Sequence, residues 1–463
     1  MRKHLVDASW LFAADIGARA LSFLAVAWLA RALEPETYGI VVIGASVLDY
    51  ALLLCDWGLK TLGTRETARP ETERGFQPHA IITARLALSL TVFVVANLAL
   101  FAVPLDPTLA MLVRIYLLGL LPYALLVDWY HQGRGAFAVI TIGRVAGSLV
   151  LVTGALLFVG APADASRVPW IYVASMAVTS IVMIVPALGA RAIVPRADDL
   201  GGVTAVLRGS TALGVAALFG QTFIVLPPIV VGHVLEPAAA GVLYAALRIV
   251  MIVLIVDRVF GALYLPALTR VWAADRSRAH ERLDAAFRVV SVLGVGASAL
   301  CMIFSAELVR LLFGERYADA SVALVVLAPF VAATLVNTFF AYGLIAIGEE
   351  RLYLRSGMLS GISFVVLLAV AVPLFGLVGA ALAMVAGETI MAFLLYARFR
   401  RHVRMRPVRP LLVSLVVAAA LFAASRALPS GALWQAPLYA AAFAGAVLLL
   451  GGVRLQDMRT NAR

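Results

Sequence analysis

The chain has 463 residues, of which 63% are hydrophobic and 14% are charged, and its formal net charge is +11. A soluble protein of this length has too little interior to bury so much apolar surface, so the composition excludes one. The basic residues are spread over many short segments, which argues against a nucleic-acid-binding surface and favours loops that face an anionic membrane leaflet.

The two cysteines and the amino-terminal segment exclude further classes. Cys55 and Cys301 both fall within apolar runs, so we expect neither a disulfide framework nor a metal site. The sequence MRKHLVDASW is not followed by a small-residue cleavage site. We therefore interpret the first apolar run as a retained helix rather than a cleaved signal.

Apolar runs of about 20 residues recur along the chain and predict an all-α polytopic membrane protein with about 14 transmembrane helices. The predicted spans are residues 9–31, 38–59, 80–103, 109–130, 137–160, 168–189, 209–232, 238–265, 287–305, 320–346, 355–373, 377–397, 410–426 and 434–453.

The segments between these spans alternate in charge. Those that we place inside hold about 26 of the 37 basic residues, an asymmetry that predicts cytoplasmic termini and an even number of crossings. The most basic inner segments are LKTLGTRETARPETERG, GARAIVPRADDLGG, RVWAADRSRAHERLDAAFR and RFRRHVRMRPVR. We expect the protein to lie in the inner, cytoplasmic membrane.

A short motif recurs after 202 residues. The tripeptide LEP at 33–35 is followed by Gly39, and the same tripeptide at 235–237 is followed by Gly241. Proline suits the first turn of a helix, and glycine one turn later permits close helix approach. The match is either generic turn chemistry or the trace of a duplication.

A duplication predicts the domain organisation. The shift covers six spans, so both copies have the same orientation, as in a repeat about an axis along the membrane normal. We predict a six-helix lobe at residues 1–200, a second at 201–400, and two additional helices with a cytoplasmic tail at 401–463. The same shift places Gln221 opposite Arg19.

The first span contains two charges, Asp15 and Arg19. Arg19 lies about 15 Å along the helix from the start of the span, near the middle of a roughly 30 Å hydrocarbon core. An ionised arginine there costs about 3 kcal/mol unless it faces water or a counter-charge. Either Asp15, one turn away, forms a structural pair with it, or both line a polar cavity.

Other charges lie at similar depths. Arg248 and Glu388 lie near the middle of their spans, and Arg144 lies in the fifth span. Arginines bind phosphate oxygens bidentately, so Arg19, Arg144 and Arg248 predict an anion site, with a purely structural ion-pair network as the alternative. Candidates for cavity polar groups or for coupling to protons or sodium are Asp15, Asp49, Asp56, Gln221, Asn337 and Glu388.

Three further charges lie close to span ends. We expect the side chains of Arg85, Asp128 and Arg258 to reach the membrane interface from there.

No catalytic motif is present: there is no phosphate-binding glycine loop, HExxH or nucleophile elbow. No segment between spans exceeds about 25 residues, too short for a catalytic domain. We therefore expect no catalytic residues, no cofactor and no enzymatic activity.

Four stretches resemble a known family. They are RALEPETYGIVVIGASVLDY (31–50), DWYHQG with ITIGR (128–133 and 140–144), LEPAAAGVLYAALRI (235–249) and LLFGERY (311–317). The chain resembles polysaccharide flippases of the Wzx type, within the superfamily of multidrug extruders and lipid II flippases. The second stretch is close to the pattern DW-x-x-QG followed by IT-x-x-R. After it the family pattern continues with acidic and basic residues, whereas Ala136, Phe137 and Ala138 stand here.

The resemblance implies two six-helix lobes in a V around a central cavity, and alternating access coupled to a cation gradient. It implies translocation of undecaprenyl-diphosphate-linked oligosaccharide repeat units, with Arg19, Arg144 and Arg248 holding the diphosphate. Of these, Arg144 alone lies in a matched motif. Membrane lipids and polymerase or export proteins are the implied partners. The alternatives are a multidrug or cation antiporter of the same superfamily, and a membrane polysaccharide polymerase or ligase.

Overall fold

The computed structural model describes residues 2–189, 193–196, 198–257, 260–261, 264, 268, 276–403, 408–427 and 433–450. Side chains are described for these residues except 2–16, 276–282, 408 and 427. Within this part of the chain all regular elements are helices. The predicted all-α class is therefore confirmed.

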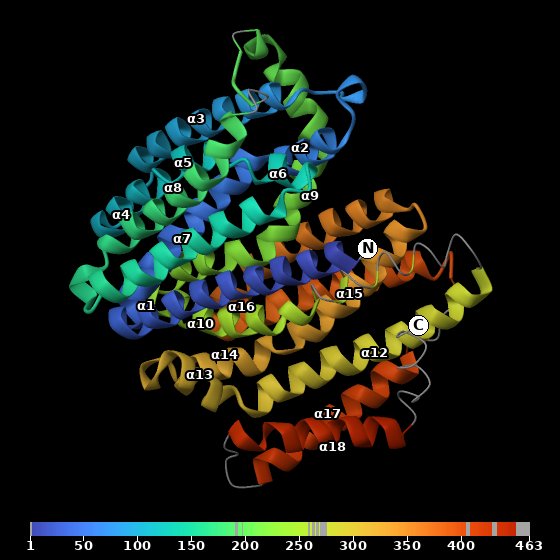
Figure 1. Ribbon diagram of the computed structural model, residues 1–463. Coiled ribbons are helices and arrows are strands. Elements are labelled where there is room, and N and C mark those ends of the chain that lie inside the picture. Colours follow the sequence, from blue (N-terminus) through green and yellow to red (C-terminus); the bar gives the residue numbers. More distant parts are fainter. Residues whose placement is uncertain are drawn as a thin grey trace. The chain divides into compact units, whose positions relative to one another are not determined.

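The chain divides into two compact units, residues 1–241 and 242–463 (Figure 1). The helices of the first unit are α1 (Arg2–Asp56), α2 (Leu59–Ala68), α3 (Pro78–Ala102), α4 (Pro107–Leu117), α5 (Leu120–Ala124), α6 (Asp128–Gly133), α7 (Phe137–Phe158), α8 (Arg167–Leu188) and α9 (Asp199–Val234). The division predicted at residues 200 and 400 stays a prediction.

Helix α10 (Pro237–Val253) begins in the first unit and continues into the second. The remaining helices of the second unit are α12 (Arg276–Ile303), α13 (Ser305–Phe313), α14 (Ala320–Leu327), α15 (Pro329–Ala346), α16 (Glu350–Phe399), α17 (Val408–Ala427) and α18 (Ala436–Leu449). Helices α12, α17 and α18 pack side by side (Figure 1).

Among the described residues, eleven helices are long and apolar enough to cross a membrane. Two of them, α1 and α16, are each divided by a kink into two segments of membrane-spanning length, which makes thirteen segments. The shorter apolar helix Leu433–Leu449 makes fourteen. The predicted polytopic fold of about 14 spans is confirmed.

Both kinks have a local cause. In α1 the kink lies at Glu34 (φ 65°, ψ 160°), directly before Pro35. Proline lacks the N–H that would continue the helix, and it disfavours helical geometry in the residue before it. In α16 the kink lies at Gly376 (φ 58°, ψ −136°), a conformation that glycine adopts without steric cost. Both positions fall between predicted spans.

The two copies of the LEP motif contact each other within the first unit. A Cβ added to Gly39 would lie 1.7 Å from the carbonyl oxygen of Pro237, and one added to Gly241 would lie 2.6 Å from the carbonyl oxygen of Pro35. Each copy therefore places its glycine against the proline of the other. The prediction that these glycines permit close helix approach is confirmed.

Helix α7 packs against both α1 and α8. The hydroxyl of Ser22 on α1 lies 3.0 Å from that of Ser148 on α7, and the Trp28 indole N–H donates to the carbonyl of Val159 at 2.9 Å. From the first contact to the second, the residue numbers rise on both helices. The first half of α1 therefore runs parallel to α7, and we call this contact the α1–α7 seam.

Glycines also hold α2 against α6. Gly58 (φ 78°) turns the chain from α1 into α2. A Cβ on Gly63 would lie 2.5 Å from the buried ring of Trp129, and one on Gly133 would lie 2.7 Å from the carbonyl oxygen of Thr64. This close packing brings the first turn of α2 to the first turn of α6.

We predict that Gly39→Ala destabilises the protein by about 1–3 kcal/mol, because the added methyl group overlaps the Pro237 carbonyl. Gly17→Ala is the matched control on α1, since no atom of the described residues lies within 4 Å of its Cβ position. It should be neutral or stabilising, because alanine is the better helix former. Thermal unfolding in detergent measures both, and equal stability of the two variants would contradict the prediction.

Candidate functional site

A buried carboxylate joins three helices of the first unit. Asp128, at the first turn of α6, is 4% exposed. The Lys60 ammonium on α2 lies 2.6 Å from its Oδ2, and the Arg144 guanidinium on α7 lies 3.9 Å from the same oxygen. The side chains of Lys60 and Arg144 are 40% and 39% exposed. One carboxylate thus positions two cations that still reach the surface of the unit.

A second ion pair lies in the same unit. Arg85 on α3 is fully buried, and its Nη2 lies 3.7 Å from Oδ1 of Asp56 at the end of α1. The Tyr123 hydroxyl donates to the same Asp56 oxygen at 3.4 Å, and its ring lies 4.4 Å from the centre of the Arg85 guanidinium. Among the described residues, the guanidinium nitrogens have no hydrogen-bond partner. Arg85 is therefore held by charge and by cation–π stacking.

These five residues, Asp56, Lys60, Arg85, Asp128 and Arg144, form what we call the first-unit charge cluster. With all five ionised it carries three positive and two negative charges.

The structure corrects one expectation from the sequence. The side chains of Arg85 and Asp128 do not extend to the membrane interface but are buried inside the unit, at 0% and 4% exposure. The reason is that each finds an opposite charge on a neighbouring helix. Arg258 lies outside the described residues.

Arg19 and Arg144 lie at the same level of the α1–α7 seam. Arg19 precedes Ser22 by three residues and Arg144 precedes Ser148 by four, so each arginine lies one turn before the same contact, on the same side of its helix. Because these helix segments run parallel, helix geometry puts two of the three predicted arginines at a similar level of neighbouring helices. Arg19 is partly exposed. The side chain of Asp15, one turn earlier, lies outside the described set.

Two other predicted residues lie elsewhere in the first unit. Asp49 is partly buried on α1, about two turns before Asp56. Gln221 is exposed on α9.

The second unit holds the remaining predicted residues. Asn337 on α15 is 7% exposed, and its side-chain N–H groups donate to the backbone carbonyl of Glu388 on α16, at 3.0 Å, and to its carboxylate. Within the part of the chain that the structure describes, the Asn337 side-chain carbonyl oxygen has no hydrogen-bond partner. On α10, Arg248 donates to the Tyr244 hydroxyl one turn earlier, and its guanidinium lies over that ring.

Three residues of the first-unit charge cluster were not among the predicted site residues: Lys60, Arg85 and Asp128. Asp128 is the first residue of the DWYHQG stretch. Other residues of the stretch have packing roles: Trp129 packs on Gly63, and Gly133 packs on α2. His131 contacts the Met183 carbonyl at 2.7 Å. The sequence offered one feature that sets Lys60 apart: it is one of only two lysines in the chain.

Comparison with known proteins gives a family and a fold. The sequence profile of the polysaccharide biosynthesis protein family matches residues 5–272. A putative O-antigen transporter of Escherichia coli is 20% identical over 394 residues, covering 82% of this chain and 93% of the relative. A probable low-salt glycan biosynthesis flippase of Haloferax volcanii is 20% identical over 386 residues, covering 81% of this chain and 78% of the relative.

Among solved structures, the lipid II flippase MurJ in an inward-closed conformation matches with a TM-score of 0.74. The match covers 97% of this chain and 99% of the other, at 10% sequence identity. It shows that the two proteins share a fold.

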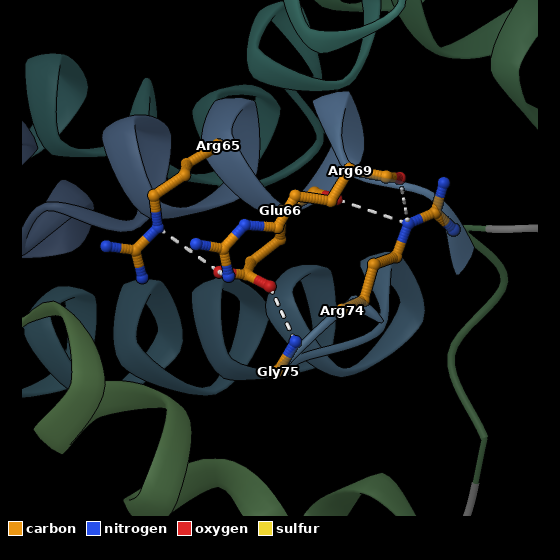
Figure 2. Close-up of polar contacts among 5 residues, drawn as sticks. All are labelled: Arg65, Glu66, Arg69, Arg74 and Gly75. Atoms are coloured by element: carbon orange, nitrogen blue, oxygen red, sulfur yellow. Dashed lines mark hydrogen bonds and ion pairs between the residues drawn. The ribbon is translucent and has the colours of Figure 1, made fainter. Parts of the chain in front are cut away.

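The basic segment after α2 is organised by one buried carboxylate (Figure 2). The Glu66 side chain is 1% exposed, and its Oε2 accepts the Gly75 N–H at 2.7 Å. Its Oε1 accepts from Arg65 at 3.2 Å and from Arg69 at 3.3 Å, while Arg74 donates to the Glu66 carbonyl at 3.2 Å. Burial opposes ionisation, but the Gly75 N–H and the arginines outweigh it, so the pKa of Glu66 lies below its ordinary value.

We predict that Glu66→Gln destabilises the protein at pH 7 by about 1–3 kcal/mol, because charge-assisted hydrogen bonds are lost from a buried site. A lowered carboxyl pKa stabilises the fold above the unfolded pKa of about 4.3, and this contribution is lost as the pH falls through the folded value. The difference between wild type and Glu66→Gln should therefore shrink below about pH 4. Glu73→Gln, exposed in the same segment, is the control. Thermal unfolding across pH tests this, and a difference that is constant with pH would contradict it.

Proposed function

We propose, from the premise that the chain belongs to the polysaccharide biosynthesis protein family, that it flips undecaprenyl-diphosphate-linked oligosaccharide repeat units across the cytoplasmic membrane. The relatives described as an O-antigen transporter and a glycan biosynthesis flippase support a lipid-linked glycan as the cargo. The observation that carries the proposal is that Arg19 and Arg144 each lie one turn before the Ser22–Ser148 contact of the α1–α7 seam. Such an arrangement favours an anionic headgroup.

The arginines offset the cost of removing the diphosphate from water. Arg19 and Arg144 belong to the first unit, and Arg248 belongs to the second. Their guanidinium groups offer paired N–H donors that match phosphate oxygens. The isoprenoid tail stays in the lipid while the sugars cross through the polar interior, and alternating access re-exposes them on the outer side.

An apolar cavity supports a lipid carrier. It lies within the second unit, has a volume of about 280 Å³, and is lined by residues of α12, α15, α17 and α18 such as Val292, Leu300, Leu335, Leu421 and Phe443. A hydrocarbon chain is the ligand that such a lining favours.

Coupling to a proton or sodium gradient is assigned to Glu388 and Asn337. The Glu388 carboxylate and the Asn337 carbonyl oxygen, which accepts no hydrogen bond from the described residues, are oxygen ligands within one side-chain pair. A proton or a hard cation binding there changes the charge of the pair, and it biases the conformations if its affinity differs between them.

Two other functions compete with this one. A multidrug or cation antiporter of the same superfamily would favour a cavity in which acids outnumber bases, whereas the sequence places more arginines than acids deep in its spans. A membrane polymerase or ligase would use the same lipid carrier and lengthen the glycan. In the proposed pathway such an enzyme, together with export proteins, is the partner that receives the flipped repeat unit at the inner membrane.

We predict that Arg19→Ala and Arg248→Ala each slow flipping by tenfold or more, because a charge-assisted hydrogen bond contributes about 1.5–3 kcal/mol. The assay uses proteoliposomes with labelled lipid-linked oligosaccharide and measures how fast the sugars become accessible on the other side. Arg114→Ala is the control, because Arg114 is exposed on α4 and stacks on Phe101. Full activity of both variants would remove the anion site, and longer glycans in the product would favour a polymerase.

We predict that Glu388→Gln abolishes stimulation of flipping by an imposed proton or sodium gradient and leaves gradient-independent exchange, because glutamine cannot exchange a proton or carry the negative charge. Glu350→Gln, exposed at the start of the same helix, should respond as wild type does. The measurement is the ratio of flipping rates with and without each gradient. An unchanged ratio in Glu388→Gln would exclude this residue from coupling.

A further inference from the structure

The two ends of helix α16 meet at one end of the second unit. Arg398, in the last turn, donates to the Leu352 carbonyl in the first turn at 2.7 Å. His402, just after the helix, has its Nε2 atom 3.9 Å from Oε1 of Glu349, the residue before the helix. The kink at Gly376 turns the chain back. The two spans of α16 therefore form a hairpin with both ends on one side of a membrane.

This junction carries an excess of positive charge. Residues 349–355 and 398–402 together contain five arginines and two glutamates, an excess of three positive charges with His402 neutral. Four of the arginines are exposed: Arg351, Arg355, Arg400 and Arg401. None of these four guanidinium groups has an ion pair or a hydrogen bond with the described residues. Their charge is therefore not neutralised within this part of the fold.

An apolar face continues from the arginines along α16. Residues three and four apart lie on one face of a helix. The exposed residues of α16 at this spacing are Arg351, Arg355, Met358, Ile362 and Val365. We call the last three the α16 stripe. The face changes from cationic to apolar within one turn, and a membrane-spanning helix places such a change where lipid headgroups meet acyl chains.

A ligand that matches both parts of this face has an anionic headgroup and a hydrocarbon chain. Guanidinium groups bind phosphate oxygens through paired N–H donors, and the α16 stripe offers an apolar surface to a chain. A phospholipid of the surrounding bilayer has both parts. A zwitterionic headgroup brings a cation of its own, which the excess positive charge repels, so the junction favours an anionic lipid.

We propose that Arg351, Arg355, Arg400 and Arg401 bind the headgroup of an anionic phospholipid, whose acyl chain lies along the α16 stripe. None of the four is among the site residues predicted from the sequence. The inference goes beyond the proposed function, because it concerns a resident lipid of the bilayer and not the transported one. It holds or fails whatever the protein translocates.

The first test uses the wild-type full chain in lipid nanodiscs. These contain phosphatidylglycerol or phosphatidylcholine with a photoreactive group in the acyl chain, and mass spectrometry maps the cross-links. Phosphatidylglycerol should label the α16 stripe about fivefold more than phosphatidylcholine does. Leu90 and Val94, exposed on α3, should be labelled equally by both lipids. Equal labelling of the α16 stripe by the two lipids would overturn the proposal.

The second test measures binding of phosphatidylglycerol to purified variants. Replacing both Arg351 and Arg355 by glutamine should weaken binding about tenfold, and replacing both by lysine should change it by less than about threefold because the charge is kept. The control replaces Arg167 and Arg310 by glutamine. It removes the same charge from two exposed arginines that already have acidic partners, and it should bind as wild type does. Unchanged binding by the folded Arg351→Gln, Arg355→Gln protein would refute the site.

A competition arm separates two sources of the phosphate group. At equal concentrations, undecaprenyl diphosphate should displace at most about half of the bound phosphatidylglycerol, as expected for ligands of similar affinity. Displacement of nearly all of it would assign these arginines to the transported lipid and overturn the proposal. If the double glutamine variant does not fold, the cross-linking of the wild-type protein decides.

Discussion

A charge enclosed by a membrane-embedded fold needs an opposite charge or water beside it, and this requirement organises the first unit. Asp128 satisfies it with cations from α2 and α7, and Asp56 satisfies it with Arg85. Removing one partner from such a pair leaves a buried charge that costs several kcal/mol. The charges therefore contribute to fixing which helices are neighbours.

Close backbone packing makes those pairings possible. Small residues permit helices to approach without a hydrophobic driving force between them, which is the usual basis of helix association in lipid. Gly63 and Gly133 serve α2 and α6 in this way, so the DWYHQG stretch combines a packing surface with the carboxylate at its start. The DWYHQG stretch, which is part of the family resemblance, therefore packs α6 against α2 and supplies the Asp128 oxygen near which Lys60 and Arg144 both lie.

The fold was largely predictable because spans, turns and kinks depend on local properties: apolar length, proline at 35 and glycine at 376. The site was predictable only in part. Depth along a helix predicted Arg19 and Arg248, and a matched motif predicted Arg144; in the structure Arg19 and Arg144 each lie one turn before the Ser22–Ser148 contact. Depth misjudged Arg85 and Asp128, because a side chain near a span end reaches the interface only if no partner lies on a neighbouring helix. That partner is a property of tertiary packing, which a single sequence does not display.

The contact between the two LEP motifs has a consequence for how this protein can change. Each glycine abuts a main-chain oxygen, not a side chain. A larger residue at Gly39 or Gly241 therefore cannot be accommodated by a smaller side chain at the contacting proline, because every amino acid has the same main-chain carbonyl oxygen. Recovery from such a substitution would have to come from shifting a whole helix, so second-site suppressors should map to distant bends in the chain rather than to the touching residues.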